Sequence, residues 1–118
     1  MPRHDDQVAL HHMLDYARTA RRMAAGRARG DLDTDEMLRL ALTRAIEVIG
    51  EAAARVSPAG RQSHPNIPWS QIVGARNRLI HGYDAINLDI LWEIVTLDLP
   101  PLISELQRVL RPEGPDVQ

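Results

Sequence analysis

The chain has 118 residues, of which 44% are hydrophobic and 25% charged, with a formal net charge of −2 at pH 7. These values are ordinary for one globular domain, and they exclude binding to nucleic acid through net charge alone. The absence of cysteine excludes disulfides and thiolate metal sites. No apolar run approaches the roughly 18 residues of a membrane span. The first residues do not resemble a signal peptide, so we expect a cytoplasmic protein without a membrane segment.

The first two expected helices cover residues 5–25 and 33–56. Counting about 100° per residue places His12 on the apolar face of the first helix. Asp33 is a suitable N-cap for the second helix, with Glu36 three residues later as its capping-box partner. A continuous apolar stripe follows, as expected for a helix that packs into a core. Its members are Met37, Leu38, Ala41, Leu42, Ala45, Val48, Ile49, Ala52, Ala53 and Val56.

Residues 57–68 are expected to form a loop, because two prolines lie near its end. Pro68 is well placed to open a short third helix, residues 68–81, which Gly82 would end.

The fourth expected helix covers residues 88–110. Pro100 and Pro101 each remove a helical donor, so we expect a kink there. Residues 112–118 are expected to be a flexible tail. No window alternates with a period of two, so the sequence predicts an all-α, antiparallel four-helix bundle that forms a single domain, residues 1–118.

The fourth helix has a second apolar patch, Ile90, Ile94 and Leu97, away from its main stripe. A helix that is apolar on two sides is buried on two sides. Two covers are possible: a second subunit, which the frequency of two-fold pairs among small proteins favours, or the loop after Ser57.

Residues 74–84, "GARNRLIHGYD", concentrate hydrogen-bonding groups at the end of an apolar segment. On an ideal third helix, Arg76 falls within the apolar face, whereas Asn77 and His81 share the opposite side. A structural role is open to each of these side chains. Arg76 could bridge buried carboxylates, His81 could interact with the helix macrodipole, and Tyr83 could pack in a turn. The alternative is a site that handles phosphate.

The stretch "IPWSQIVGARNRLIHGYD", with "IGEAAARVS" before it and "LWEIVTLDLPPLISEL" after it, resembles the HepT-type HEPN proteins. Their hallmark is an arginine, about four residues, a histidine, one residue and a tyrosine, which matches Arg76, His81 and Tyr83. The resemblance covers about residues 33–110, and the motif shows no departure from the family pattern.

The resemblance implies an all-α homodimer that acts as the toxin of a toxin–antitoxin pair. Such toxins are described as metal-independent ribonucleases with the motif Arg and His in a cleft at the dimer interface. By position, Arg76 and His81 become catalytic candidates, and Asn77 follows the motif arginine as in the family. The implied partner is an MNT-type nucleotidyltransferase antitoxin, which transfers AMP from ATP to the motif tyrosine, here Tyr83. No cofactor is expected.

This chemistry is consistent with the residue types. RNA carries its own nucleophile, the 2′-hydroxyl, and a histidine can take or supply the proton. An arginine can hold the negative charge that grows on the phosphate. Arg76 and His81 lie about 140° apart on an ideal helix, so they converge only if Arg76 reaches around, if the last turn unwinds, or if they meet across the dimer. The last arrangement is the one we favour.

Two carboxylates are candidates for supporting roles. Asp84 could accept a hydrogen bond from Arg76 or Arg78. Glu51 could pair with Arg55 one turn later, or it could be the partner of Arg76. The five histidines have no ligand-like spacing, so no metal site is expected.

A second function belongs to a different class. The near-neutral charge and the scarcity of aromatic residues that could stack on bases are also consistent with a non-catalytic helical module that docks a nucleotidyltransferase partner.

Overall fold

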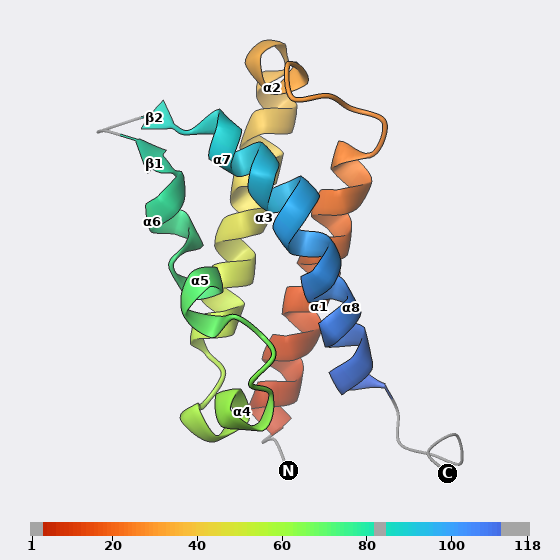
Figure 1. Ribbon diagram of the computed structural model, residues 1–118, viewed down its shortest axis with the longest axis vertical. Helices are drawn as coiled ribbons and strands as arrows, with labels where there is room; N and C mark the ends of the chain where they lie inside the picture. The colour runs from red at the N-terminus through yellow and green to blue at the C-terminus, as the bar shows by residue number, and fades with distance from the viewer. Residues whose placement is uncertain (1–3, 82–84, 112–118) are drawn as a thin grey trace.

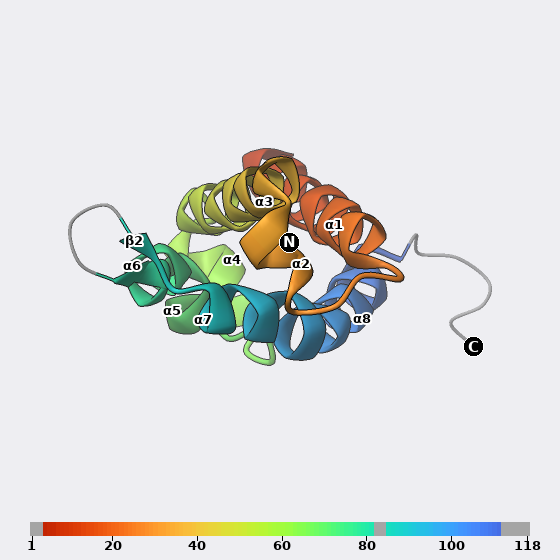
Figure 2. The ribbon, with the colours of Figure 1, turned by 90° about the horizontal axis from the view of Figure 1, so that it is seen from above.

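The computed structural model describes residues 4–81 and 85–111. Long helical segments run along the molecule, and shorter elements join them (Figure 1). Seen from above, α1 and α3 form one layer, and the segments α5–α6 and α7–η1–α8 form the other (Figure 2). In chain order the elements are α1 (His4–Ala24), α2 (Asp31–Thr34), α3 (Glu36–Ala54), α4 (Pro58–Ser63), α5 (Trp69–Val73), α6 (Ala75–Leu79), β1 (Ile80–His81), β2 (Ala85–Ile86), α7 (Leu88–Glu93), the π-helical segment η1 (Ile94–Asp98) and α8 (Leu99–Leu110). The predicted all-α bundle is confirmed.

Helix α1 packs against both α3 and α8. Its buried face is rotated from the expected one, because it is centred on Leu10 and Leu14 rather than on His12 and Tyr16. Both of the latter side chains are exposed, so the placement of His12 on the core face was wrong. The buried face includes a carboxylate, that of Asp6, which counting only apolar positions does not anticipate.

The second long helix, α3, begins at Glu36 rather than near Asp33. The carboxylate of Asp35 caps it by accepting a hydrogen bond from the Leu38 N–H at 3.0 Å. The proposed cap at Asp33 was therefore wrong, since Asp33 lies within the separate short helix α2. Arg27 holds Asp35 with an ion pair at 2.7 Å, so the turn before α2 is tied to the start of α3.

The segment expected to be a loop contains helix α4. Ser57 caps α4 by accepting from the Gly60 N–H, and its hydroxyl donates to the buried Asp6 carboxylate at 2.6 Å. The Ser57 N–H donates to the same carboxylate. A Cβ on Gly60 would lie 2.5 Å from an Asp6 oxygen, so α4 approaches α1 this closely only because residue 60 has no side chain. A capping serine followed by Pro58 at the first helical position is the signal that could have predicted α4.

The last long helix widens before its two prolines. The Leu99 N–H donates to the Ile94 carbonyl five residues back, which defines η1 as a π-helical turn. A wider turn advances less than the 100° per residue of an α-helix, so the buried residues Leu91, Val95 and Leu99, spaced by four, stay on one face. The expected irregularity near Pro100 therefore takes the form of a widened turn just before it.

The second apolar patch on this helix is only partly exposed. Ile94 is buried within the subunit, Ile90 is half-buried and packs against the core, and Leu97 is 64% exposed. The expectation that all three residues form an outward face was therefore wrong for Ile94. Ile94 follows the buried Leu91 by three residues, a spacing that places both side chains on the same face of a regular helix.

Candidate active site

The motif arginine, Arg76, lies on α6, which is a separate helix from α5. The chain breaks at Gly74, whose N–H donates to the Ser70 carbonyl, and α6 restarts with Ala75. Ala75 and Leu79, one turn apart, are the buried residues of α6, and the helix packs against α3 and α7. An angle of 100° per residue does not predict which side chains of residues 68–81 share a face, because the break at Gly74 interrupts the regular helical rotation.

Arg76 is exposed, so its expected place within the apolar face was wrong. Among the residues that the structure describes, no carboxylate lies within ion-pair distance of its guanidinium. Asn77 beside it is exposed as well. An exposed arginine without a carboxylate partner is available to bind a phosphate, which a buried, paired arginine would not be.

The third helix ends earlier than expected. Ile80 has an extended backbone, with ψ of 124°, and it begins the two-residue strand β1, which pairs antiparallel with β2. His81 therefore follows the helix in an extended segment, opposite Ala85. The last turn of the expected helix is therefore unwound, which is one of the three arrangements that could bring Arg76 and His81 together. The favoured arrangement, a meeting across a dimer, stays a prediction. The search for alternating apolar and polar residues missed this strand pair, because each strand has only two residues.

Three predicted site features lie outside the described residues: the His81 side chain, Tyr83 and Asp84. In the chain, Tyr83 and Asp84 belong to the connection between β1 and β2.

Glu51 contacts neither of its expected partners. Its carboxylate lies 3.4 Å from the Arg44 guanidinium, which also contacts Glu47 at 3.3 Å. Residues 44 and 51 are seven apart, two helical turns, so they share one face of α3. The hydrogen bond that Arg44 donates to the Glu47 carboxylate, followed by the charge of Glu51, raises the pKa of Arg44. The assignment of Glu51 to Arg55 or Arg76 was therefore wrong.

Next to Glu51, Gly50 brings α3 close to the motif segment. A Cβ at position 50 would lie 3.2 Å from the Ile72 carbonyl oxygen, at the end of α5. This glycine allows close contact between the two backbones immediately before the break at Gly74.

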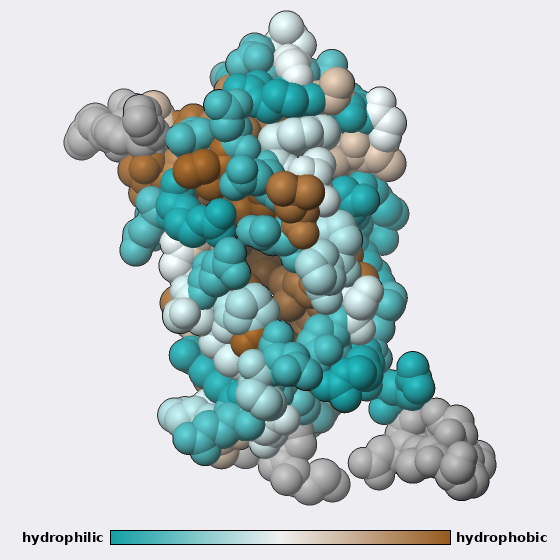
Figure 3. All heavy atoms as spheres, in the orientation of Figure 1, coloured by the Kyte–Doolittle hydropathy of each residue, from teal (hydrophilic) through white to brown (hydrophobic). Residues whose placement is uncertain are grey.

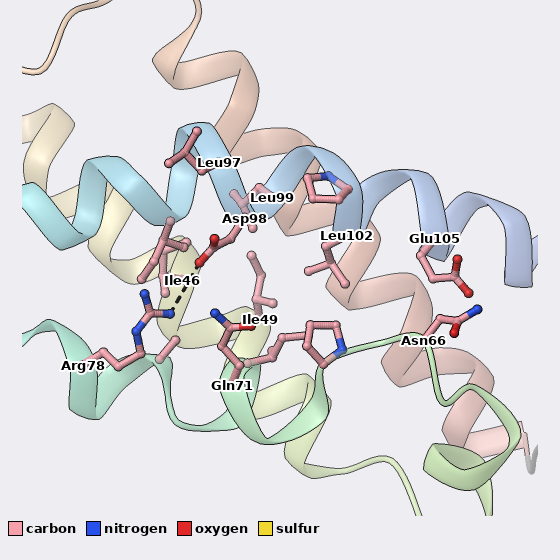
Figure 4. Close-up of a pocket in the computed structure, with 15 residues that line it drawn as sticks. Ile46, Ile49, Asn66, Gln71, Arg78, Leu97, Asp98, Leu99, Leu102 and Glu105 are labelled. Atoms are coloured by element: carbon pink, nitrogen blue, oxygen red, sulfur yellow. Dashed lines mark hydrogen bonds and ion pairs between the residues drawn. The ribbon is translucent and has the colours of Figure 1, made fainter.

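A cleft of about 270 Å³ separates the motif segment from the C-terminal helix. Figure 3 shows it as a hollow with a hydrophobic floor on the face of the molecule, and Figure 4 shows the side chains around it. The floor is apolar, with contributions from Ile46, Ile49, Ile72, Ala75, Ile94, Leu99 and Leu102. The polar side chains at its margins are Asn66, Gln71, Arg78, Asp98 and Glu105.

An ion pair bridges one end of this cleft. Arg78 from α6 and Asp98 from η1 point toward one another in Figure 4, with Nη1 and Oδ2 3.4 Å apart. At the other end, the Arg108 guanidinium is the main cause that lowers the pKa of Glu105, and a hydrogen bond from Asn66 adds to it. Nothing in the sequence pattern links Arg78 to Asp98, because they are 20 residues apart and the π-turn that places Asp98 was not predicted.

Within residues 4–81 and 85–111, no three His, Asp or Glu side chains gather in a way that could hold a metal ion. Over the same residues, no helix is long and apolar enough to cross a membrane.

The fold and the motif define a small all-α protein with a short arginine-bearing helix beside a cleft. Residues 13–109 match the family model described as ribonuclease HepT-like. The chain therefore belongs to the HepT-like family of HEPN proteins.

Relatives of similar length are found in archaea and bacteria. "Putative RNase MJ1380" of Methanocaldococcus jannaschii is 34% identical over 92% of this chain and 100% of its own length. "Putative RNase TTE0752" of Caldanaerobacter subterraneus is 32% identical over 88% of this chain and 93% of its own. "Probable ribonuclease HepT" of Thermococcus cleftensis is 33% identical over 67% of this chain and 72% of its own. No solved structure matches the chain significantly. Family and relatives together support a ribonuclease of the HepT type.

Proposed function

We propose that this protein is the toxin of a HepT/MNT-type toxin–antitoxin pair, a metal-independent endoribonuclease that acts as a homodimer. One observation carries the proposal: within a chain of the ribonuclease HepT-like family, the motif arginine, Arg76, is exposed and has no carboxylate partner among the described residues. A positively charged group in this state can bind the phosphate of a substrate without first breaking an ion pair to any of the described carboxylates.

In the proposed reaction, the ribose 2′-hydroxyl attacks the adjacent phosphorus. The bond from phosphorus to the 5′-oxygen breaks, which leaves a 2′,3′-cyclic phosphate and a 5′-hydroxyl. His81 takes the proton from the 2′-hydroxyl, and the second copy's imidazole supplies the proton to the leaving oxygen. Arg76 stabilises the charge on the non-bridging phosphate oxygens, and the neighbouring amide of Asn77 is available to orient the substrate.

Cleavage of a labelled RNA in the presence of EDTA tests this assignment. Arg76→Ala and His81→Ala should each lower kcat/KM by about 10²- to 10⁴-fold, the range typical for loss of a charge-stabilising or proton-transfer group. Arg22→Ala is the matched control, because Arg22 is exposed on α1 and bonds only to Thr19 among the described residues. Equal cleavage by the wild type and both motif variants would remove the assigned roles.

The homodimer is supported by the exposed Leu97 at the margin of the cleft and by the need for both an acid and a base. Sedimentation over a range of protein concentrations tests it. A single subunit at every concentration at which RNA is cleaved would contradict the shared-cleft mechanism.

Neutralisation is proposed to occur by AMP transfer to Tyr83. The tyrosine oxygen attacks the α-phosphorus of ATP, pyrophosphate leaves, and the phenolic proton passes to solvent. The added phosphodiester would repel RNA and block the motif. With an MNT-type nucleotidyltransferase and ATP, the intact mass should rise by whole AMP units. Tyr83→Phe should abolish this increase and Tyr16→Phe, which removes the chain's other tyrosine, should not. Modification that persists in Tyr83→Phe would refute the assignment.

The non-catalytic binding module remains the competing function, favoured by the net charge of −2. Growth under induced expression separates the two functions. Arrest by the wild type, relieved by the nucleotidyltransferase partner and by His81→Ala, supports the toxin, whereas harmless expression supports the module.

A further inference from the structure

The helix that carries Arg76 is poorly held on one side. Helix α6 has only five residues, too few to be stable without tertiary contacts. It rests on α3 and α7, but the cleft of about 270 Å³ lies between it and the segment η1–α8. Direct packing therefore does not fix α6 from the cleft side.

The Arg78–Asp98 pair supplies a contact across this gap. Arg78 follows the proposed catalytic Arg76 by two positions on the same helical turn, and its guanidinium reaches Asp98 at 3.4 Å. Both side chains are partly buried, with exposed fractions of 33% and 38%. Their mutual attraction is consequently less screened than that of a fully exposed pair.

Asp98 does not perform the role that its position would ordinarily give it. It precedes α8 at the N-cap position, where an aspartate usually accepts a hydrogen bond from the first turn. Here its side chain makes no capping bond, and Pro100 and Pro101 remove two of the N–H groups that would need one. The π-turn leaves the carboxylate directed at Arg78 instead (Figure 4).

We propose that Asp98, acting through Arg78, is a positioning residue that holds α6 in the orientation in which Arg76 and the segment leading to His81 can engage RNA. This inference rests on the proposed ribonuclease function. Neither residue needs to touch the reacting phosphate. Their pairing sets the angle of α6 across the cleft, and misplacement of catalytic groups by about 1 Å is enough to lower a rate substantially.

Steady-state cleavage of RNA by the variants Asp98→Asn and Arg78→Gln distinguishes a positioning role of the pair from a direct electrostatic effect on RNA. Positioning predicts that both variants lower kcat by about tenfold with little change in KM. A direct electrostatic effect on RNA predicts opposite changes instead. Loss of the Asp98 charge would lower KM, loss of the Arg78 charge would raise it, and kcat would stay the same; this pattern would overturn the proposal.

The reversed pair, Arg78→Asp with Asp98→Arg, should recover most of the kcat lost in Arg78→Asp alone. Asp89→Asn is the control, because Asp89 forms another ion pair between distant segments, with Arg29 at 2.6 Å, away from the cleft. It should leave kcat unchanged.

Hydrogen exchange of the free protein provides a readout without RNA. The Arg78 N–H bonds to the Gly74 carbonyl, and the Asn87 N–H bonds to the Leu79 carbonyl at 2.7 Å, so both amides report on how firmly α6 is held. Their exchange should be faster in Asp98→Asn and unchanged in Asp89→Asn. Unchanged protection in Asp98→Asn would refute positioning even if RNA is cleaved. A wild type that cleaves no RNA would refute the proposed function while this measurement still decides whether the pair holds α6.

Discussion

The guanidinium of Arg21 on α1 donates to the Val95 carbonyl in η1 at 3.2 Å. This carbonyl has lost its helical donors. The Leu99 N–H, four residues later, bonds to Ile94 instead, and Pro100, five residues later, has no N–H. Arg21 therefore satisfies a backbone group that the π-turn and the proline leave without an intrahelical partner.

Arg21→Met should destabilise the fold by about 1–3 kcal/mol, the cost of an unsatisfied buried carbonyl. Methionine keeps most of the apolar side-chain length and removes the donor. Arg22→Met, whose arginine is exposed, should change stability by less than about 0.5 kcal/mol. Urea denaturation measures both values, and equal effects would show that the Val95 carbonyl finds another donor.

Ser57→Ala should cost about 1–3 kcal/mol, because it removes the cap of α4 and a hydroxyl that donates to the buried Asp6 carboxylate. Gly60→Ala should also destabilise, since its Cβ would lie 2.5 Å from Asp6. Ser63→Ala is the matched control on the same short helix, because the Ser63 hydroxyl bonds only to an exposed carbonyl. If thermal unfolding shows the same loss of stability in Ser63→Ala as in Ser57→Ala, this account is contradicted.

Leu42→Ala should destabilise by about 2–5 kcal/mol, the usual cost of removing a buried leucine side chain. Leu42 is fully buried on α3, and Leu40, two residues earlier on the same helix, is 60% exposed. Leu40→Ala should therefore shift stability by less than about 0.5 kcal/mol. A comparable loss in the two variants would mean that the exposed face of α3 is covered in the assembled protein.

The Arg27–Asp35 pair should make stability depend on pH. The hydrogen bond from Arg27, followed by that from the Leu38 N–H, lowers the pKa of Asp35. A carboxyl whose pKa is lower in the folded state stabilises the fold above its unfolded pKa of about 3.9, and this contribution disappears as the pH falls through the folded value. Asp35→Asn keeps a capping side chain and removes the charge. The urea midpoints of wild type and variant should differ most near neutral pH and converge below about pH 4. A constant difference would exclude the charge as its cause.

The sequence was sufficient to predict the bundle, because long apolar stripes such as that of residues 37–56 have few competing interpretations. It failed where the backbone departs from an ideal helix. The break at Gly74 moved Arg76 from the expected apolar face to the surface. This error comes from carrying a constant angle per residue across a local irregularity.

The predictions for the candidate site also differ in outcome according to what they depended on. The family resemblance predicted Arg76 and Asn77 as site residues, and this assignment stays a prediction. Both are exposed, which is consistent with binding to phosphate. The partner of Glu51 and the Arg78–Asp98 link were not found, because each depends on how long side chains extend in three dimensions. Ion pairs between distant segments leave no periodic trace in a sequence.

The widened turn at Ile94–Asp98 holds one residue more than an α-helical turn would. Deleting one residue there would allow a regular α-helix and leave the following residues facing nearly the same way, because a π-turn with its extra residue and an α-turn cover nearly the same rotation. Leu102 and Leu106 would then stay in the interior. This chain should therefore tolerate a one-residue deletion in these five residues, as it should in the turn near Gly26 and Gly30, although both stretches join helices.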